Sequence, residues 1–231
     1  MQIIRSHQRH YADHGWLKSF WLFSFADFYD PDNLGCGVLR VFNDDLIAPG
    51  SGFPLHPHRE MEIITVVIKG AITHEDSMGH RTVVSAGDVQ RMTAGTGVLH
   101  SEFNLDDEAV HLYQIWIIPR TRRTAPSYAQ RHFEPEQWRN TLLPVASGQD
   151  YAGAIPLNAN ATIYRAGLEA GNTIEIPGSS GRAVFVYLEY GRLAIAGAEL
   201  LAHDQLRVHP HGPLRATAHA DTALILIDSA A

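Results

Sequence analysis

The chain has 231 residues, of which 45% are hydrophobic and 19% charged, with a formal net charge of −7. This balance is typical of a globular protein with one large β domain or two domains of about 100 residues. It argues against nucleic acid or an anionic membrane as the main partner, because no basic block is present to neutralise phosphates. Residues 1–16 are polar, no run suits a membrane helix, and Cys36 is the only cysteine. We therefore expect a cytoplasmic protein without internal disulfides.

Short segments rich in Val, Ile, Thr and aromatic residues recur between Gly and Pro, which indicates many short strands. In the first half, strands are expected over 61–69, 82–84, 89–92 and 112–118. From 121 to 149 the periodicity fades, and one short helix is expected around 135–140. In the second half, strands are expected over 173–176, 183–188, 193–195, 206–208, 214–218 and 223–227.

The two halves share a faint repeat. Val66–Ile72 and Tyr187–Leu193 have the same apolar pattern around one Gly, and Ala86–Met92 similarly matches Ala202–Val208. The matches keep their order and nearly their separation, so they predict a duplicated unit. We predict an all-β protein with two tandem antiparallel β-barrels, over 1–125 and 150–231, joined by a short helical linker over 126–149.

Two short polar segments in the first half combine residues that bind metals. Alternate side chains of a strand share a face, so His56-Pro57-His58 directs two imidazoles to one side, and His100-Ser101-Glu102 directs an imidazole and a carboxylate. The same alternation would place Glu62 on the face of the His56 pair. Three imidazoles and one carboxylate leave coordination positions open, as in a catalytic metal site.

Spacing alone does not identify the ligands, because His209-Pro210-His211 repeats it. The pair at His56 differs in its surroundings: Gly50 precedes it, Glu62 and Gly70 follow it, and Thr93–Asn104 is a Gly-rich segment. We expect the remaining candidates to be non-ligands: His74, His80, His111, His132, His203, His209, His211 and His219.

This ordered set resembles the two motifs of the cupin superfamily, Gly-x5-His-x-His-x3-Glu and a Gly-rich turn before a His. Thr93 replaces the usual Pro of the second motif, and the interval from Gly95 to His100 is longer than in most cupins. The form Thr-Ala-Gly-x-Gly-x-x-His-Ser-Glu is similar to that of the pirin family, as are His14-Gly15-Trp16 and Tyr113–Trp116. The resemblance covers the first half in detail and the second half by architecture, which implies two cupin-like barrels (a bicupin).

The resemblance implies metal ligands at His56, His58, His100 and Glu102, with Glu62 beside them orienting an imidazole. The metal would be one divalent transition ion, Fe(II) foremost, with Zn, Mn, Co, Ni or Cu as alternatives. The second half lacks both motifs, so its unit is expected to bind no metal.

Bacterial pirin-like proteins resemble quercetin 2,3-dioxygenases, which open the central ring of flavonols with O2 and release CO. This implies a small aromatic substrate, with Glu102 as the catalytic base and Trp16, Phe23 and Phe25 stacking on the flat ring. One alternative is a non-enzymatic regulatory protein with redox-sensitive iron, and another is a zinc-dependent isomerase or hydrolase. We expect a monomer.

Overall fold

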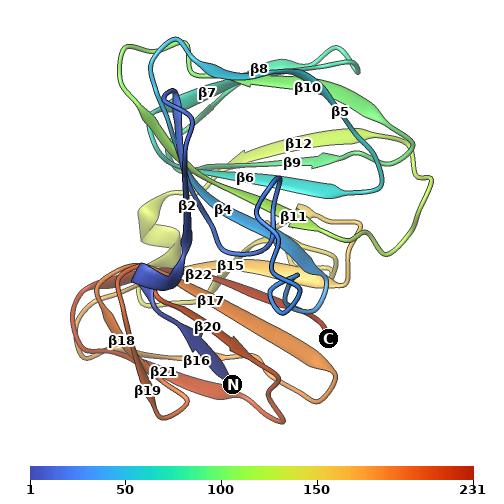
Figure 1. Cartoon of the computed structure of the whole chain (residues 1–231). Coiled ribbons are helices and arrows are strands. Elements are labelled where there is room, and N and C mark those ends of the chain that lie inside the picture. Colours follow the sequence, from blue (N-terminus) through green and yellow to red (C-terminus); the bar gives the residue numbers. More distant parts are fainter.

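The computed structural model describes residues 1–231 and contains 22 strands and two short 3-10 helices. They form two units stacked on each other (Figure 1). The first unit contains β2 (His10–Asp13), β3 (Leu17–Trp21), β4 (Leu39–Ile47), β5 (Gly52–His58), β6 (Glu62–Lys69), β7 (Ala71–Asp76), β8 (Arg81–Ser85), β9 (Asp88–Thr93), β10 (Val98–Phe103), β11 (Val110–Ile117) and β12 (Ser127–His132). The second contains β1 (Gln2–Ile4), β13 (Leu143–Ser147), β14 (Ile155–Pro156), β15 (Ala161–Leu168), β16 (Thr173–Ile176), β17 (Arg182–Tyr190), β18 (Arg192–Ile195), β19 (Ala198–Leu201), β20 (Gln205–Val208), β21 (Leu214–Ala218) and β22 (Thr222–Ala230).

Each unit pairs a seven-stranded sheet with a four-stranded sheet, and the strand orders correspond. The first unit has β12-β9-β6-β11-β4-β3-β2 and β5-β10-β7-β8, and the second has β1-β20-β17-β22-β15-β13-β14 and β16-β21-β18-β19. The central strands β9-β6-β11-β4 thus match β20-β17-β22-β15, as the sequence repeat predicts. The expectation of closed barrels is wrong, since no hydrogen-bonded ladder joins the two sheets of a unit. Each unit is a sandwich of two separate sheets, and the chain crosses between them only in turns, for example between β4 and β5 and between β6 and β7.

The two seven-stranded sheets lie back to back in the middle of the molecule (Figure 1). Between them lies a core of 24 buried residues drawn from both units. Phe42 of β4 is central to it, with its ring centroid 5.2 Å from that of Phe185 and 5.1 Å from that of Tyr187. Burial of large aromatic side chains is strongly stabilising, so this interface joins the units into one body. β1 lies at the N-terminal end, just before the strands of the first unit, but it pairs with β20 in the second unit. This pairing adds a further connection between the units.

Residues 126–149 differ from the expected helical linker. Most of this stretch is extended, since β12 pairs with β9 and β13 pairs with β15. The only helical part is the single 3-10 turn η2 (Pro135–Trp138). Pro135 favours a helix start, but Asn140, with φ of 54°, turns the backbone away soon after it. The other 3-10 helix is η1 (Ser6–Gln8), and neither is long and apolar enough to cross a membrane.

Candidate metal centre

Three imidazoles of the first unit converge between its sheets. β5 and β10 are antiparallel neighbours, and their register places His56 directly opposite His100 and His58 opposite Val98. The ring centroid of His56 lies 4.7 Å from that of His58 and 4.4 Å from that of His100, and the His58–His100 distance is 4.9 Å. Their ligand nitrogens all lie within 4.8 Å of one another. The structure thus brings His100, from one of the two pairs expected from strand alternation, next to His56 and His58 of the other pair.

Glu102 lies two residues beyond His100 on β10 and is 1% exposed. Its carboxylate is held by amides of the seven-stranded sheet. Gln90 Nε2 donates to Oε1 at 2.5 Å, and Gln114 Nε2 donates to Oε2 at 3.0 Å. Glu102 belongs with His100 to a second cluster of possible ligand atoms, completed by His74. All four expected ligands therefore lie in one connected group, with His100 at its centre.

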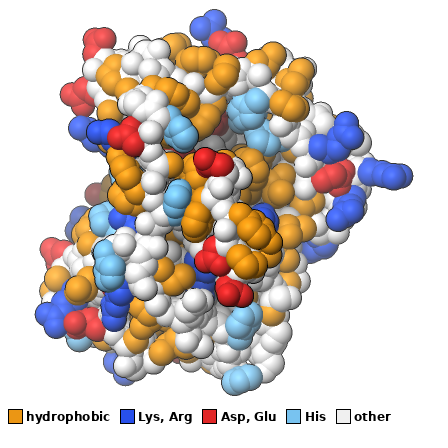
Figure 2. Space-filling model, in the orientation of Figure 1, with side chains coloured by type: hydrophobic (Ala, Val, Ile, Leu, Met, Phe, Trp, Pro, Cys, Tyr) orange, Lys and Arg blue, Asp and Glu red, His pale blue; other side chains and the backbone are white.

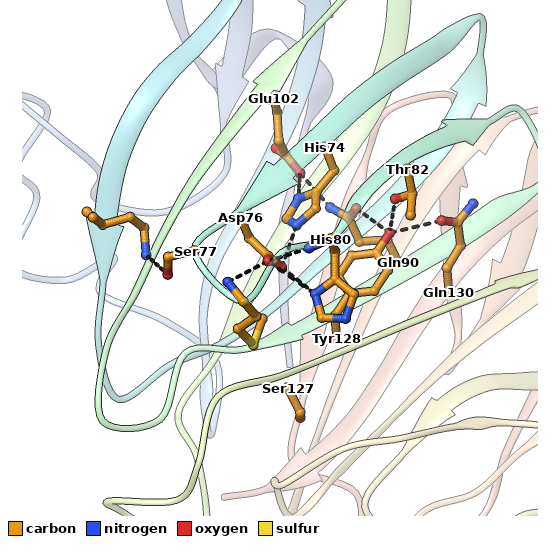
Figure 3. A network of polar contacts seen from close by, with 12 residues as sticks. His74, Asp76, Ser77, His80, Thr82, Gln90, Glu102, Ser127, Tyr128 and Gln130 are labelled. Carbon is orange, nitrogen blue, oxygen red and sulfur yellow. Dashed lines mark hydrogen bonds and ion pairs between the residues drawn. The ribbon is translucent and has the colours of Figure 1, made fainter.

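His74 is a residue of this site that the sequence analysis placed among the non-ligands. It lies on β7, is fully buried, and has its Nδ1 3.8 Å from Glu102 Oε1. On its other side, Nε2 lies 3.1 Å from Asp76 Oδ2, and Asp76 also contacts the half-exposed ring of His80 at 2.9 Å (Figure 3). A chain of polar groups thus leads from Glu102 to the surface. The only feature of the sequence that could have indicated these contacts is the alternation His74-Glu75-Asp76, which places His74 and Asp76 on one face of the strand beside β10.

The ionisation states suit metal binding. Burial, together with the neighbouring imidazoles, lowers the pKa of His58 to about 4, and burial lowers that of His100 to about 4. Burial would raise the pKa of Glu102, but the nearby imidazoles of His74 and His100 outweigh it and lower that pKa to about 2. At neutral pH the two imidazoles are therefore neutral and the carboxylate is ionised. These are the forms that donate electron pairs to a metal.

The histidines also have free ligand atoms. Both ring nitrogens of His100 are buried and have no hydrogen-bond partner. A buried polar atom without a partner costs about 1–3 kcal/mol, which a bound cation would offset. His56 Nδ1 lies 2.7 Å from the carbonyl oxygen of Pro54, an arrangement that places the proton on Nδ1 and leaves Nε2 free as a ligand. The residues present therefore fit one metal ion.

Glu62 does not orient an imidazole, and that expectation is wrong. Its Oε2 accepts hydrogen bonds from the Thr93 hydroxyl and from the backbone N–H of Asn158, both at 3.0 Å. β5 ends at His58, and Glu60 with φ of 54° breaks the strand before β6 begins. Side-chain alternation does not carry across such a break. Glu62 consequently faces the second unit and connects the two units.

A cavity of about 400 Å³ opens beside the histidines and is lined by all four expected ligands. Figure 2 shows histidine side chains bordering a hollow in the upper unit. Its aromatic lining consists of Trp16, Trp21, Phe25, Phe53 and Trp116. Two of the three aromatic residues expected near a substrate are thus present. Phe23 is not, because it is buried in the core between the units, 5.7 Å from Phe185.

Comparisons with known proteins agree with this architecture. Residues 4–117 match the family model described as Pirin, and residues 144–229 match the model described as Quercetinase C-terminal cupin domain. A pirin-like protein of Caulobacter vibrioides is 42% identical over 220 residues, which is 95% of each chain. A quercetin 2,3-dioxygenase of Escherichia coli K12 is 37% identical over 227 residues, covering 98% of this chain and 97% of that protein.

Among solved structures, the bacterial pirin YhhW of Escherichia coli in complex with nickel(II) superposes with a TM-score of 0.94 at 36% identity, over 99% of this chain and 98% of that one. The two stacked units and the histidine cluster place the chain among cupin-type proteins with two domains. Within that class, the chain belongs to the pirin family.

Proposed function

We propose that this protein is a metal-dependent dioxygenase that opens the central ring of flavonols such as quercetin with O2 and releases CO. The observation that carries the proposal is the meeting of three histidines and an ionised Glu102 within one aromatic-lined cavity. A set of neutral imidazoles and a carboxylate with open positions suits oxygen-using metals. The names of the relatives agree with this activity.

His56, His58, His100 and Glu102 would hold the metal, for which we propose Fe(II). Nickel(II), present in the related Escherichia coli pirin, is compatible with the same ligands, as are Mn, Co, Cu and Zn. When bound, such a metal would lower the pKa of a coordinated flavonol hydroxyl and supply the redox chemistry that O2 requires.

The chain itself would bind the substrate and move its proton. Glu102 is ionised at neutral pH, so one of its oxygens is able to accept the proton of the 3-hydroxyl. The rings of Trp21, Phe25 and Trp116 line the cavity and would hold a flat aromatic substrate by edge and face contacts. Trp21 and Trp116 each lie 5.4 Å, centroid to centroid, from Phe25 at steep angles, so the wall is already packed before a ligand enters.

The test is oxygen uptake and CO release on quercetin, with the protein purified without oxygen and loaded in turn with Fe(II), Ni(II), Mn(II), Co(II), Cu(II) and Zn(II). We expect turnover with a redox-capable metal and its loss in His56→Ala and Glu102→Ala. A matched control is His209→Ala/His211→Ala, because that exposed pair repeats the His-x-His spacing in the second unit. The control should keep full activity.

Other outcomes would overturn the proposal. Stoichiometric bound iron without turnover of any flavonol would favour a non-enzymatic regulatory protein. Oxygen-independent turnover with zinc would favour an isomerase or hydrolase. Equal activity in wild type and His56→Ala would show that the cluster is not the site.

A further inference from the structure

The wall of the cavity opposite the histidines carries two polar side chains without an assigned role. Asn43 and Asp45 alternate on β4, so they share a face, and both line the cavity. β4 belongs to the seven-stranded sheet, whereas His56 and His100 lie on the facing four-stranded sheet. A ligand held at the histidines would therefore extend toward Asn43 and Asp45.

Asn43 has an amide that is 3% exposed and makes no hydrogen bond, and its Oδ1 is buried without a partner. It continues a row of polar residues across the sheet, because Asn43 pairs with Gln114, Gln114 with Thr65, and Thr65 with Gln90. The other three members of the row contact the Glu102 carboxylate. Asn43 alone has its polar atoms free, so its partner has to come from within the cavity.

Asp45 shows the same lack of partners. Its carboxylate is 2% exposed, and its only hydrogen bond is the one that the Ser19 hydroxyl donates. Burial, together with the neighbouring carboxylates of Asp44 and Glu102, raises its pKa to about 7. The hydrogen bond from Ser19 and the charge of His111 offset only part of the loss of solvent. The adjacent Asp44 faces the other way and is satisfied by Arg9, Tyr187 and His111. Asp44 thus serves the contact between the units, and Asp45 is left for the cavity.

The chemistry of this wall limits the ligand. The free oxygens of Asn43 and Asp45 accept hydrogen bonds from hydroxyl groups, and the Asn43 amide also donates one. The cavity lining includes no Lys or Arg, so no such side chain is present to pair with a second anionic group on the ligand, whereas Asp45 would repel it. We propose that Asn43 and Asp45 form a polar shelf that recognises phenolic hydroxyls of the substrate remote from the metal. The inference rests on the proposed function, and it narrows the substrate class to uncharged aromatics with hydroxyls on an outer ring.

The test compares two ligands that share the 3-hydroxyl, namely quercetin and 3-hydroxyflavone, which lacks the outer hydroxyls. Affinity is measured by calorimetry without oxygen, so that binding does not depend on turnover, on the Fe(II)-loaded and the metal-free chain. We expect the wild-type protein to bind quercetin at least about tenfold more tightly than 3-hydroxyflavone, as expected for paired hydroxyls. In Asn43→Leu and in Asp45→Leu, which each remove one of the two acceptors, the quercetin affinity should fall and the ratio of quercetin to 3-hydroxyflavone affinity should move toward one, with the 3-hydroxyflavone affinity unchanged.

Asn43→Leu is nearly isosteric and orphans no partner, so it should fold, and circular dichroism checks this. Asn172→Leu, the same exchange in the second unit, is the matched control and should keep the wild-type ratio. A ratio near one in wild type, or an unchanged ratio in both shelf variants, would overturn the shelf even if quercetin is turned over. Conversely, selective binding without turnover would support the shelf and overturn the dioxygenase.

Discussion

The two units share one topology, but the interior of the first contains the polar site and the interior of the second is apolar. His56 pairs with His100 in the first unit, and at the corresponding place in the second Ile176 pairs with Leu214. The adjacent pair, Phe53 with Glu102, corresponds to Ile174 with Ala216. The correspondence extends to the rest of the site: His74 matches Ile195, and Gln114 matches Leu226.

These exchanges have a clear consequence for packing. The interior of the second unit is one cluster of 17 buried apolar residues. The interior of the first holds only separate clusters of seven and four, and the polar site lies between them. Buried polar groups are costly unless paired, so the first unit depends more on the core that it shares with the second. The comparison shows that one strand pattern supports either a site or a core, according to which residues occupy a single face.

The largest expected effect comes from giving strand β5 of the first unit apolar residues, as the matching strand of the second unit has. In His56→Ile/His58→Ile, we expect metal content to fall to below about 0.1 per chain, with an affinity loss beyond the roughly 10–100-fold typical of residues that only orient ligands. The melting temperature of the metal-free chain should not fall, because isoleucine suits an apolar interior. Elemental analysis measures the metal content, and calorimetry measures the metal affinity and the melting temperature. Full metal content in this variant would contradict the assignment of the ligands.

The converse change removes apolar packing from the second unit. Leu226 is fully buried at the position that corresponds to Gln114. Leu226→Ala should destabilise the chain by about 2–5 kcal/mol through lost contacts and the cavity left behind. Chemical denaturation measures the loss, and metal stoichiometry should stay at the wild-type value. A loss of metal without loss of stability would show that the second unit acts directly on the site.

Acidification should affect the first unit through His100. Its pKa in the folded chain is about 4, below the ordinary value of 6.5, so between these pH values the unfolded state binds more protons. Stability of the metal-free protein should therefore fall as pH drops from 6.5 to 4, by up to roughly 3 kcal/mol from this group. The dependence of the denaturation midpoint on pH should become flatter in His100→Ala and should remain as in the wild type in His209→Ala. An unchanged slope in His100→Ala would contradict the buried neutral imidazole.

The smallest expected effect concerns the support of Glu102. Gln114→Leu, which introduces the residue found at the equivalent Leu226, removes the donor to Glu102 Oε2. We expect about a tenfold weaker metal affinity or activity, because a carboxylate without its donor is less well oriented. The matched control is Leu226→Met, a change of similar volume in the second unit. An effect in the control as large as in Gln114→Leu would mean that the loss is one of general packing.

Much of the local arrangement followed from the sequence. The period of two in a strand places His56 with His58, and His100 with Glu102, whatever the rest of the fold. The repeat around Gly70 and Gly191 likewise indicated two copies of one unit, since both glycines have positive φ at matching turns. Family motifs added the expectation that the two polar pairs meet.

Only the tertiary structure decided what the facing strands contribute. His74, Asn43 and Asp45 join the site through pairings between strands distant in sequence, which no local pattern specifies. Glu62 lies outside the site because Glu60, with its positive φ, interrupts the alternation of side chains between β5 and β6. The alternation of side chains is a property of the local backbone, so it can be read from the sequence. The register between paired strands, and which strands face each other across the cavity, depend on the packing of the whole chain.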